Sequence, residues 1–184
     1  MTDNHRTTGK QQSQSQRVAI GKQQSQSQRV AMLLDSQGVH LNQKQAELLL
    51  TFAKSKGRLE RPKNYYNPQQ KNQFNDKIRL EKLGFQGVDV PSGKNSADKQ
   101  LVFDCIKRVA IKPSPDIIIL VLGDRDFAGL ITVLKGLGIT VIVFARRKSA
   151  SKKLINLVGE DNFHDVDELS SLCAGLKAQL ENQK

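Results

Sequence analysis

The sequence contains no tryptophan, two cysteines and three histidines. Cys105 and Cys173 lie far apart, and no second pair accompanies them. This usage is typical of a protein kept in a reducing cytoplasm and excludes a disulfide framework. The few histidines and cysteines also lack the spacing of zinc ligands, so no zinc site is expected.

Long hydrophobic runs are absent as well. No apolar stretch is long enough to span a bilayer, and the polar N-terminal residues contain no apolar segment of the kind found in signal peptides. We therefore expect a cytoplasmic protein without a membrane partner.

The chain has 184 residues, of which 38% are hydrophobic. That is enough for one domain with a sizeable core and some additional tail. The formal net charge of +11 favours a polyanionic partner, although such a charge also serves solubility alone.

Basic residues are concentrated in three places. Residues 1–29 carry a net charge of +4, and residues 54–82 hold nine basic residues against three acids. A third cluster has no acidic residue within it and consists of Arg146, Arg147, Lys148, Lys152 and Lys153.

A tandem duplication occupies the beginning of the chain. The segment Gly-Lys-Gln-Gln-Ser-Gln-Ser-Gln-Arg-Val-Ala at residues 9–19 recurs unchanged at residues 21–31. Gln/Ser-rich sequence buries little apolar surface, so we expect residues 1–28 to form a disordered basic tail and residues 29–184 to form the domain.

Within the domain, apolar runs alternate with segments of helical periodicity. The runs predict strands at residues 29–34, 59–66, 85–90, 117–122, 139–144 and 162–164. Pro62 is expected to place the second of these strands near a sheet edge. The periodic segments predict helices at residues 41–56, 68–83, around 101–109, 127–134, 149–158 and 167–180. This alternation indicates an α/β fold with a mainly parallel sheet covered on both faces.

Four aspartates follow or flank the predicted strand ends. Asp35 ends the first strand, Asp98 opens the helix after the third, and Asp124 and Asp126 follow the strand at 117–122. The carboxyl ends of parallel strands share one edge, so these acids can converge there. Converging carboxylates favour a hard divalent cation such as Mg²⁺ or Mn²⁺, which supports phosphodiester hydrolysis. A simpler interpretation is that Asp124 or Asp126 caps the next helix and that Asp98 only complements a helix dipole.

Three motifs surround these aspartates. They are Val-Ala-Met-Leu-Leu-Asp-Ser-Gln-Gly-Val from residue 30, Gly-Lys-Asn-Ser-Ala-Asp-Lys-Gln-Leu-Val-Phe-Asp from residue 93, and Leu-Gly-Asp-Arg-Asp-Phe from residue 122. In this order they resemble the motifs of the NYN domain, and most closely those of the LabA-like branch of the PIN-like ribonuclease superfamily. The resemblance covers about residues 29–169.

The resemblance implies a three-layer α/β/α PIN fold with a five- or six-stranded sheet and an acidic, Mg²⁺- or Mn²⁺-dependent ribonuclease site. Asp35, Asp98, Asp124 and Asp126 match the family's acids and are the expected metal ligands and catalytic residues. Asp104 matches a further family acid, but its place inside the helix favours a structural role. Lys94 is either a phosphate contact or a solvated loop charge.

Two positions depart from the family pattern. Ser36, Gln37 and Gly38 stand where the family has Gly-x-Asn, and Leu122 replaces a serine that commonly precedes Gly-Asp. The lost amide and hydroxyl weaken metal binding or shift the substrate, while all four principal acids remain.

For an RNA-cleaving enzyme, the expected partner is single-stranded RNA. Arg146, Arg147 and Lys148 would guide its backbone, and Tyr65 and Tyr66 would stack on bases, unless the two rings pack within the sheet instead. A homodimer is also considered, because PIN relatives often dimerise.

The sequence also allows three other interpretations. A LabA-like regulatory protein that binds RNA or a protein partner with little catalysis is the main alternative, since relatives of that name act in gene regulation. A Toprim-like fold requires a Glu after the first strand, whereas Glu47 is the next acid after Asp35. A response-regulator receiver would require an acidic pair there.

Overall fold

The computed structural model describes residues 27–93, 95–122 and 127–181. Its strands are β1 (Arg29–Asp35), β2 (Arg58–Leu59), β3 (Lys63–Tyr66), β4 (Gln86–Asp89), β5 (Ile117–Val121), β6 (Thr140–Ala145) and β7 (Phe163–Asp165). Its α-helices are α1 (Gln43–Ser55), α2 (Lys71–Lys82), α3 (Ser96–Ala110), α4 (Ala128–Gly136), α5 (Lys152–Val158) and α6 (Leu169–Glu181). Short 3-10 helices, η1 (Glu160–Asn162) and η2 (Val166–Glu168), flank β7.

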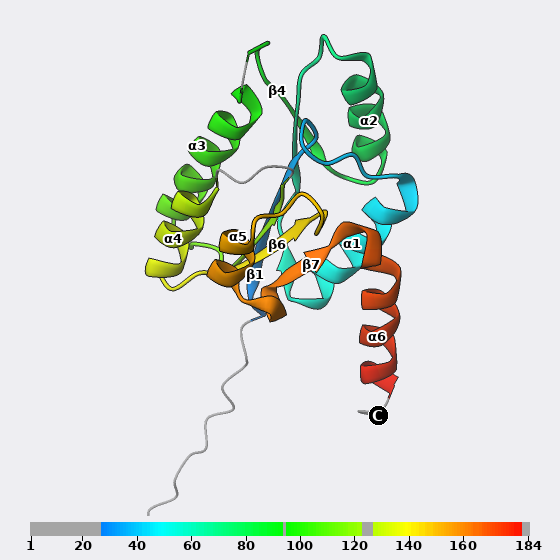
Figure 1. The fold of residues 1–184 in the computed structure, drawn as a ribbon, viewed down its shortest axis with the longest axis vertical. Coiled ribbons are helices and arrows are strands. Elements are labelled where there is room, and N and C mark those ends of the chain that lie inside the picture. Colours follow the sequence, from blue (N-terminus) through cyan, green and yellow to red (C-terminus); the bar gives the residue numbers. More distant parts are fainter. Residues whose placement is uncertain (1–26, 94, 123–126, 182–184) are drawn as a thin grey trace, which may run out of the picture.

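The strands of the described chain form one sheet in the order β4-β3-β1-β5-β6-β7, with β2 paired to β1 beside β3. Every strand pairing in it is parallel. The chain builds outward from β1 to β4 and then returns to the centre to build outward from β5 to β7 (Figure 1). The direction of winding therefore reverses between β1 and β5, the position at which open α/β sheets bind their ligands.

Helices cover both faces of the sheet. In Figure 1, α3 and α4 lie to the left of the strands, and α1, α2 and α6 lie to the right. One core joins α3, α4 and α5 to alternate strand residues such as Leu33 and Leu120. The other joins α1, α2 and α6 to the intervening residues, such as Leu34 and Val121. The predicted three-layer α/β/α architecture with a mainly parallel sheet is confirmed.

The connection after β1 is fixed on both sides. Asn42 and Gln45 form a reciprocal capping box at the start of α1. Asp76 of α2, which is buried, pairs with His40 and with Arg79, and Arg79 also donates to the carbonyl of Leu41. These contacts tie the turn beyond Asp35 to two helices.

Pro62 interrupts the strand expected at residues 59–66. Proline has no N–H to donate to a ladder, and the chain forms two short strands, β2 and β3, on either side of it. β3 is not itself an edge strand, because it pairs with β1 on one side and β4 on the other, but β4 is the last strand of the sheet, so β3 lies near an edge as expected. The expected short edge strand near residues 162–164 is present as β7.

Among the described helices, none is both long and apolar enough to cross a membrane.

Gly57 marks a close approach of two backbone segments. Its φ angle is +151°, and a Cβ atom added there would lie 2.1 Å from the carbonyl oxygen of Gln28. The amide of Arg58 donates to that same oxygen at 2.7 Å. Only glycine allows β2 to meet the chain that enters β1 at this distance.

We predict that Gly57→Ala lowers the free energy of unfolding by about 2–4 kcal/mol, because it adds backbone strain and breaks the Arg58–Gln28 hydrogen bond. Gly84→Ala is the matched control. Gly84 has a φ angle of +98° but no atom within 4 Å of an added Cβ. Gly84→Ala should therefore lower the free energy of unfolding through backbone strain alone, by about 1–2 kcal/mol. Urea denaturation measures both, and equal losses would contradict the predicted clash.

Candidate active site

Asp35 lies at the carboxyl end of β1 and is 2% exposed. Side chains alternate along a strand, so Asp35 shares the sheet face of Ala31 and Leu33, which pack in the core that includes α3. Its Oδ1 atom accepts a hydrogen bond from the amide of Gln37 at 2.8 Å. The carboxylate is therefore oriented by the turn that follows it, on the face covered by α3.

Asn64 is a polar residue near Asp35 that the sequence analysis did not identify. It is fully buried on β3, one residue before Tyr65, the register partner of Asp35. Its Oδ1 atom accepts a hydrogen bond from the hydroxyl of Ser36, and its Nδ2 atom has no partner within the described ranges. Asn64 pairs in register with Leu34, so it lies on the opposite face of the sheet from Asp35 and fixes the turn through Ser36 without replacing the missing amide. The sequence feature that could have identified Asn64 is its position within a predicted strand, directly before two tyrosines.

Asp98 lies in the first turn of α3 and is half-buried. It lines a cavity of about 500 Å³ together with Phe127 and residues of α3. Phe127 is the first described residue after the Gly-Asp-Arg-Asp segment. One flank of that segment therefore shares a cavity with Asp98.

The other flank lies beside Asp35. Leu34 and Val121 are register partners on β1 and β5, so Asp35 and Leu122 each come one residue after a paired position. Leu122 is fully buried, and its amide donates to the carbonyl of Phe144 at 2.9 Å. Asp124, Asp126 and Lys94 themselves lie outside the described residues. Of the four predicted ligands, the structure thus places Asp35 and Asp98, at the two described flanks of the other pair.

Asp104 joins α3 to β3. Its Oδ2 atom accepts from Lys63 Nζ at 2.7 Å and from the hydroxyl of Tyr65 at 3.0 Å, and its Oδ1 atom accepts from Gln100 at 3.0 Å. Burial alone would raise the pKa of Asp104, but these hydrogen bonds outweigh it and hold the pKa below its usual value. The contacts are those of a structural clamp that holds the helix carrying Asp98 against the neighbour of β1.

The predicted stacking of Tyr65 and Tyr66 on RNA bases was wrong. Tyr65 is fully buried and Tyr66 is 2% exposed, so neither ring is accessible to a base. Burial, assisted by Asp104, raises the pKa of Tyr65, and burial together with Asp89 raises the pKa of Tyr66 to about 12. Both rings pack within the fold because both residues lie on β3, an internal strand.

The loop after β6 carries basic residues to the same sheet edge as Asp35. Arg146, Arg147 and Lys148 are exposed there. Arg147 forms an ion pair with Glu160 at 3.2 Å and lies over the Phe163 ring at 5.1 Å. The acid that pairs with this basic cluster therefore lies outside the cluster itself, on η1. Arg146 and Lys148 form no ion pair with any described carboxylate.

Both cysteines are free and buried. Burial raises the pKa of the Cys105 thiol to about 12, so this side chain acts as a small apolar residue of the core. Within the described ranges, no three His, Cys, Asp or Glu side chains gather as a metal-binding group.

The fold agrees with the comparisons to known proteins. The sequence model of the NYN domain family matches residues 29–167. The chain therefore belongs to the NYN family and has its PIN-like nuclease fold. A crystal structure of a protein of unknown function from Vibrio parahaemolyticus is 24% identical, with a TM-score of 0.66 over 80% of this chain and 98% of that chain. It shares the fold.

A second solved structure, described as the glycotransferase of kitacinnamycin, is 16% identical over 73% of this chain and 35% of that chain. Its TM-score of 0.36 is too low to indicate a common fold. No curated protein matches the chain.

We predict that Asp104→Asn lowers the free energy of unfolding at pH 7 by about 1–3 kcal/mol, because the Lys63 ion pair is lost. The folded-state pKa of Asp104 lies below its unfolded value of about 3.9, so the carboxylate stabilises the fold above that pH. This stability disappears as the pH falls through the folded pKa. The difference between wild type and variant should therefore shrink as the pH falls below the unfolded value of about 3.9 and through the lower folded pKa.

Urea denaturation across this pH range measures the effect. Asp161→Asn, at an exposed acid of η1, serves as the matched control and should show no such pH-dependent difference. A difference for Asp104→Asn that is constant with pH would contradict the ionic clamp.

Proposed function

We propose that the protein is a Mg²⁺- or Mn²⁺-dependent ribonuclease that hydrolyses RNA phosphodiesters at Asp35, Asp98, Asp124 and Asp126, acting as an endonuclease on single-stranded RNA. One observation carries the proposal. Asp35 and Asp98, from β1 and α3, lie at the two described flanks of the segment that contains Asp124 and Asp126. Membership of the NYN family supports the same reaction class.

The donor set fits a hard divalent cation. Asp35 and Asp98 offer carboxylate oxygens at the winding switch between β1 and β5, and Asp124 and Asp126 would add two more carboxylates. Oxygen ligands of this kind suit Mg²⁺ or Mn²⁺. When bound, such an ion would polarise the phosphoryl group and favour water as the nucleophile.

The chain's own groups would orient the substrate. The Gln37 amide fixes one oxygen of Asp35, and the Asp104 clamp fixes α3 and with it Asp98. Arg146 and Lys148, exposed on the loop after β6, would attract the RNA backbone towards this edge. Lys94, two residues before α3 begins, is proposed as a further phosphate contact.

We predict cleavage of single-stranded RNA in Mn²⁺ or Mg²⁺ and loss of cleavage in EDTA. Asp35→Asn or Asp124→Asn should lower kcat on the order of 10²–10³-fold or more, because several kcal/mol of metal-assisted stabilisation disappears. A gel assay of a labelled oligonucleotide measures the rate. Asp161→Asn should cleave at the wild-type rate, and cleavage that survives EDTA or Asp124→Asn would refute the proposal.

A second candidate function is that of a LabA-like regulatory protein that binds RNA or a protein partner and turns over weakly. The specific observation in its favour is Leu122. This side chain is fully buried in the core where the family commonly has a serine hydroxyl. The chain therefore offers no metal or phosphate contact from that side chain.

Isothermal titration calorimetry separates the two functions. For the ribonuclease we expect heat on titration with Mn²⁺ that Asp35→Asn and Asp98→Asn each diminish, because each removes a carboxylate ligand. No heat at millimolar Mn²⁺, together with undiminished RNA binding, would favour the regulator.

A further inference from the structure

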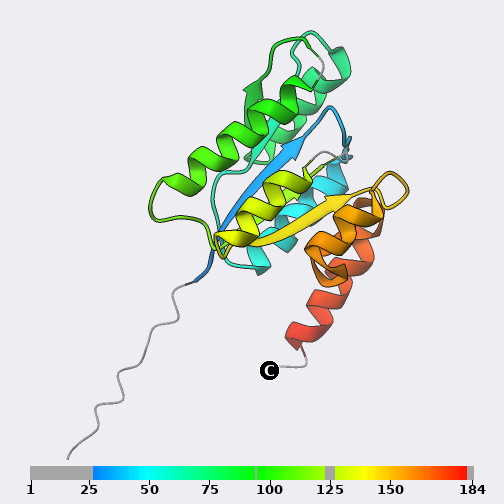
Figure 2. The same cartoon turned by 60° about the vertical axis from the view of Figure 1, so that its left-hand side comes forward.

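An arginine-lined cavity lies at the edge of the sheet opposite to Asp35. It has a volume of about 450 Å³, and its lining includes Arg29, Arg58, Arg61 and Arg108. Arg29 begins β1 and Asp35 ends it, so the length of the strand separates the cavity from the carboxylates. Figure 2 shows β1 running from the end where the described chain begins towards the opposite end of the molecule.

Most of the positive charge in this cavity is not neutralised by the described part of the chain. Glu60 also lines the cavity, but Arg108 donates to both of its carboxylate oxygens. Arg108 further donates to the carbonyls of Ile111 and Pro113, so it is committed to the end of α3. Arg29, Arg58 and Arg61 form no ion pair with a described carboxylate.

The backbone places two of the three remaining arginines side by side, and Arg61 lines the same cavity. Arg29 and Arg58 are register partners on β1 and β2, and the amide of Arg58 donates to Gln28. Asp116 accepts a hydrogen bond from the amide of Arg29 at 2.7 Å, which fixes the start of β1. Like charges placed this close repel one another unless an anion joins them.

The sequence directly before the cavity contains no carboxylate that could supply that anion. No Asp or Glu occurs between Asp3 and Asp35, and the duplicated repeat places a basic pair in each copy, Lys10 with Arg17 and Lys22 with Arg29. Repeated basic residues that lead directly into an arginine cavity match a ligand with repeated negative charges. Guanidinium groups bind phosphate oxygens in a bidentate manner, which suits phosphodiesters better than isolated carboxylates.

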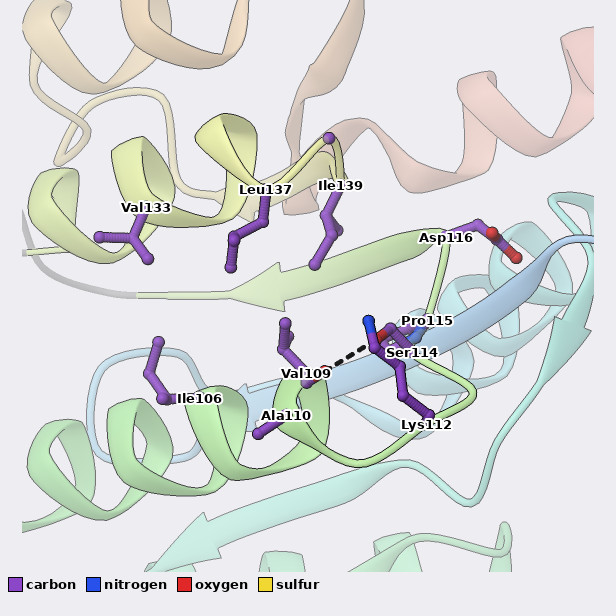
Figure 3. Close-up of a pocket in the computed structure, with 11 residues that line it drawn as sticks. Ile106, Val109, Ala110, Lys112, Ser114, Pro115, Asp116, Val133, Leu137 and Ile139 are labelled. Carbon is purple, nitrogen blue, oxygen red and sulfur yellow. Dashed lines mark hydrogen bonds between the residues drawn. The ribbon is translucent and has the colours of Figure 1, made fainter.

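The adjacent groove at this end has a different character. It lies between α3 and α4, has a volume of about 470 Å³, and is lined by apolar side chains such as Ile106, Val133 and Leu137 (Figure 3). Positive charge is therefore concentrated on the β2 side of this end.

We propose that Arg29, Arg58 and Arg61 form a second RNA-binding site, which holds backbone phosphates at the amino-terminal edge of the sheet. RNA as the ligand is taken from the proposed function, whereas the cavity and its charge do not depend on catalysis. Arg29 and Asp35 are six residue steps apart along β1, which is about 20 Å, since a strand advances about 3.3 Å per residue. A tetranucleotide cannot reach both edges, and an RNA of about 30 nucleotides can.

The test compares Arg58→Glu/Arg61→Glu with Lys44→Glu/Lys177→Glu, which makes the same change in net charge at exposed positions on α1 and α6. Fluorescence anisotropy in EDTA measures binding of a single-stranded RNA of about 30 nucleotides without cleavage. The arginine variant should bind about tenfold more weakly, and its log–log salt slope should fall by about 0.7 per lost phosphate contact. The lysine variant should bind within about twofold of wild type. Circular dichroism verifies that both variants fold.

Equal weakening in both double variants, or no weakening in either, would overturn the inference, as would absence of RNA binding by the wild-type protein. Cleavage of a tetranucleotide tests the proposed function separately, and the arginine variant should cleave it at the wild-type rate. If no variant cleaves but long-RNA binding still depends on the arginines, the ribonuclease proposal fails and the second site stands.

Discussion

The parallel pairing of β1 with β5 is the constraint on which the site depends. Five consecutive register pairs, from Val30 with Ile117 to Leu34 with Val121, join two strands far apart in the sequence. Both strands are buried on both faces, so their register is fixed by packing on each side of the sheet. A slip of one residue would turn Asp35 from the α3 face to the α1 face and separate it from Asp98.

Much of this arrangement was predictable from local sequence. Apolar runs bounded by glycine, proline and aspartate located the main strands, and their alternation with helical periodicity predicted a covered parallel sheet. The positions of Asp35 and Asp98 at a common edge followed from that topology, because parallel strands end together. The family resemblance, drawn from short motifs at these positions, is confirmed at the level of the NYN domain.

Other features depend on long-range contacts that periodicity does not encode. Pro62 signalled an interruption, but the internal position of β3 results from pairing with both β1 and β4. Tyr65 is buried on an internal strand, and its hydroxyl donates to Asp104, 39 residues away. Likewise, Glu160 opposes Arg147 only because β7 returns to the edge of β6. Asn64 could be noticed in the sequence, but its contact with Ser36 required the register of β3 against β1.

The sheet also divides the interior into two cores with different roles. Asp35, by strand alternation, faces the core of α3, α4 and α5, and Asp98 belongs to one of those helices. The core beneath α1, α2 and α6 contributes to the same fold from the far side of the strands. A substitution in that core changes mainly the stability of the fold. A substitution in the core beneath α3 also changes the positions of the carboxylates. Stabilising substitutions are therefore best introduced on the side of the sheet that α1 and α6 cover. Relatives can also differ in sequence on that side without a change in the acidic edge.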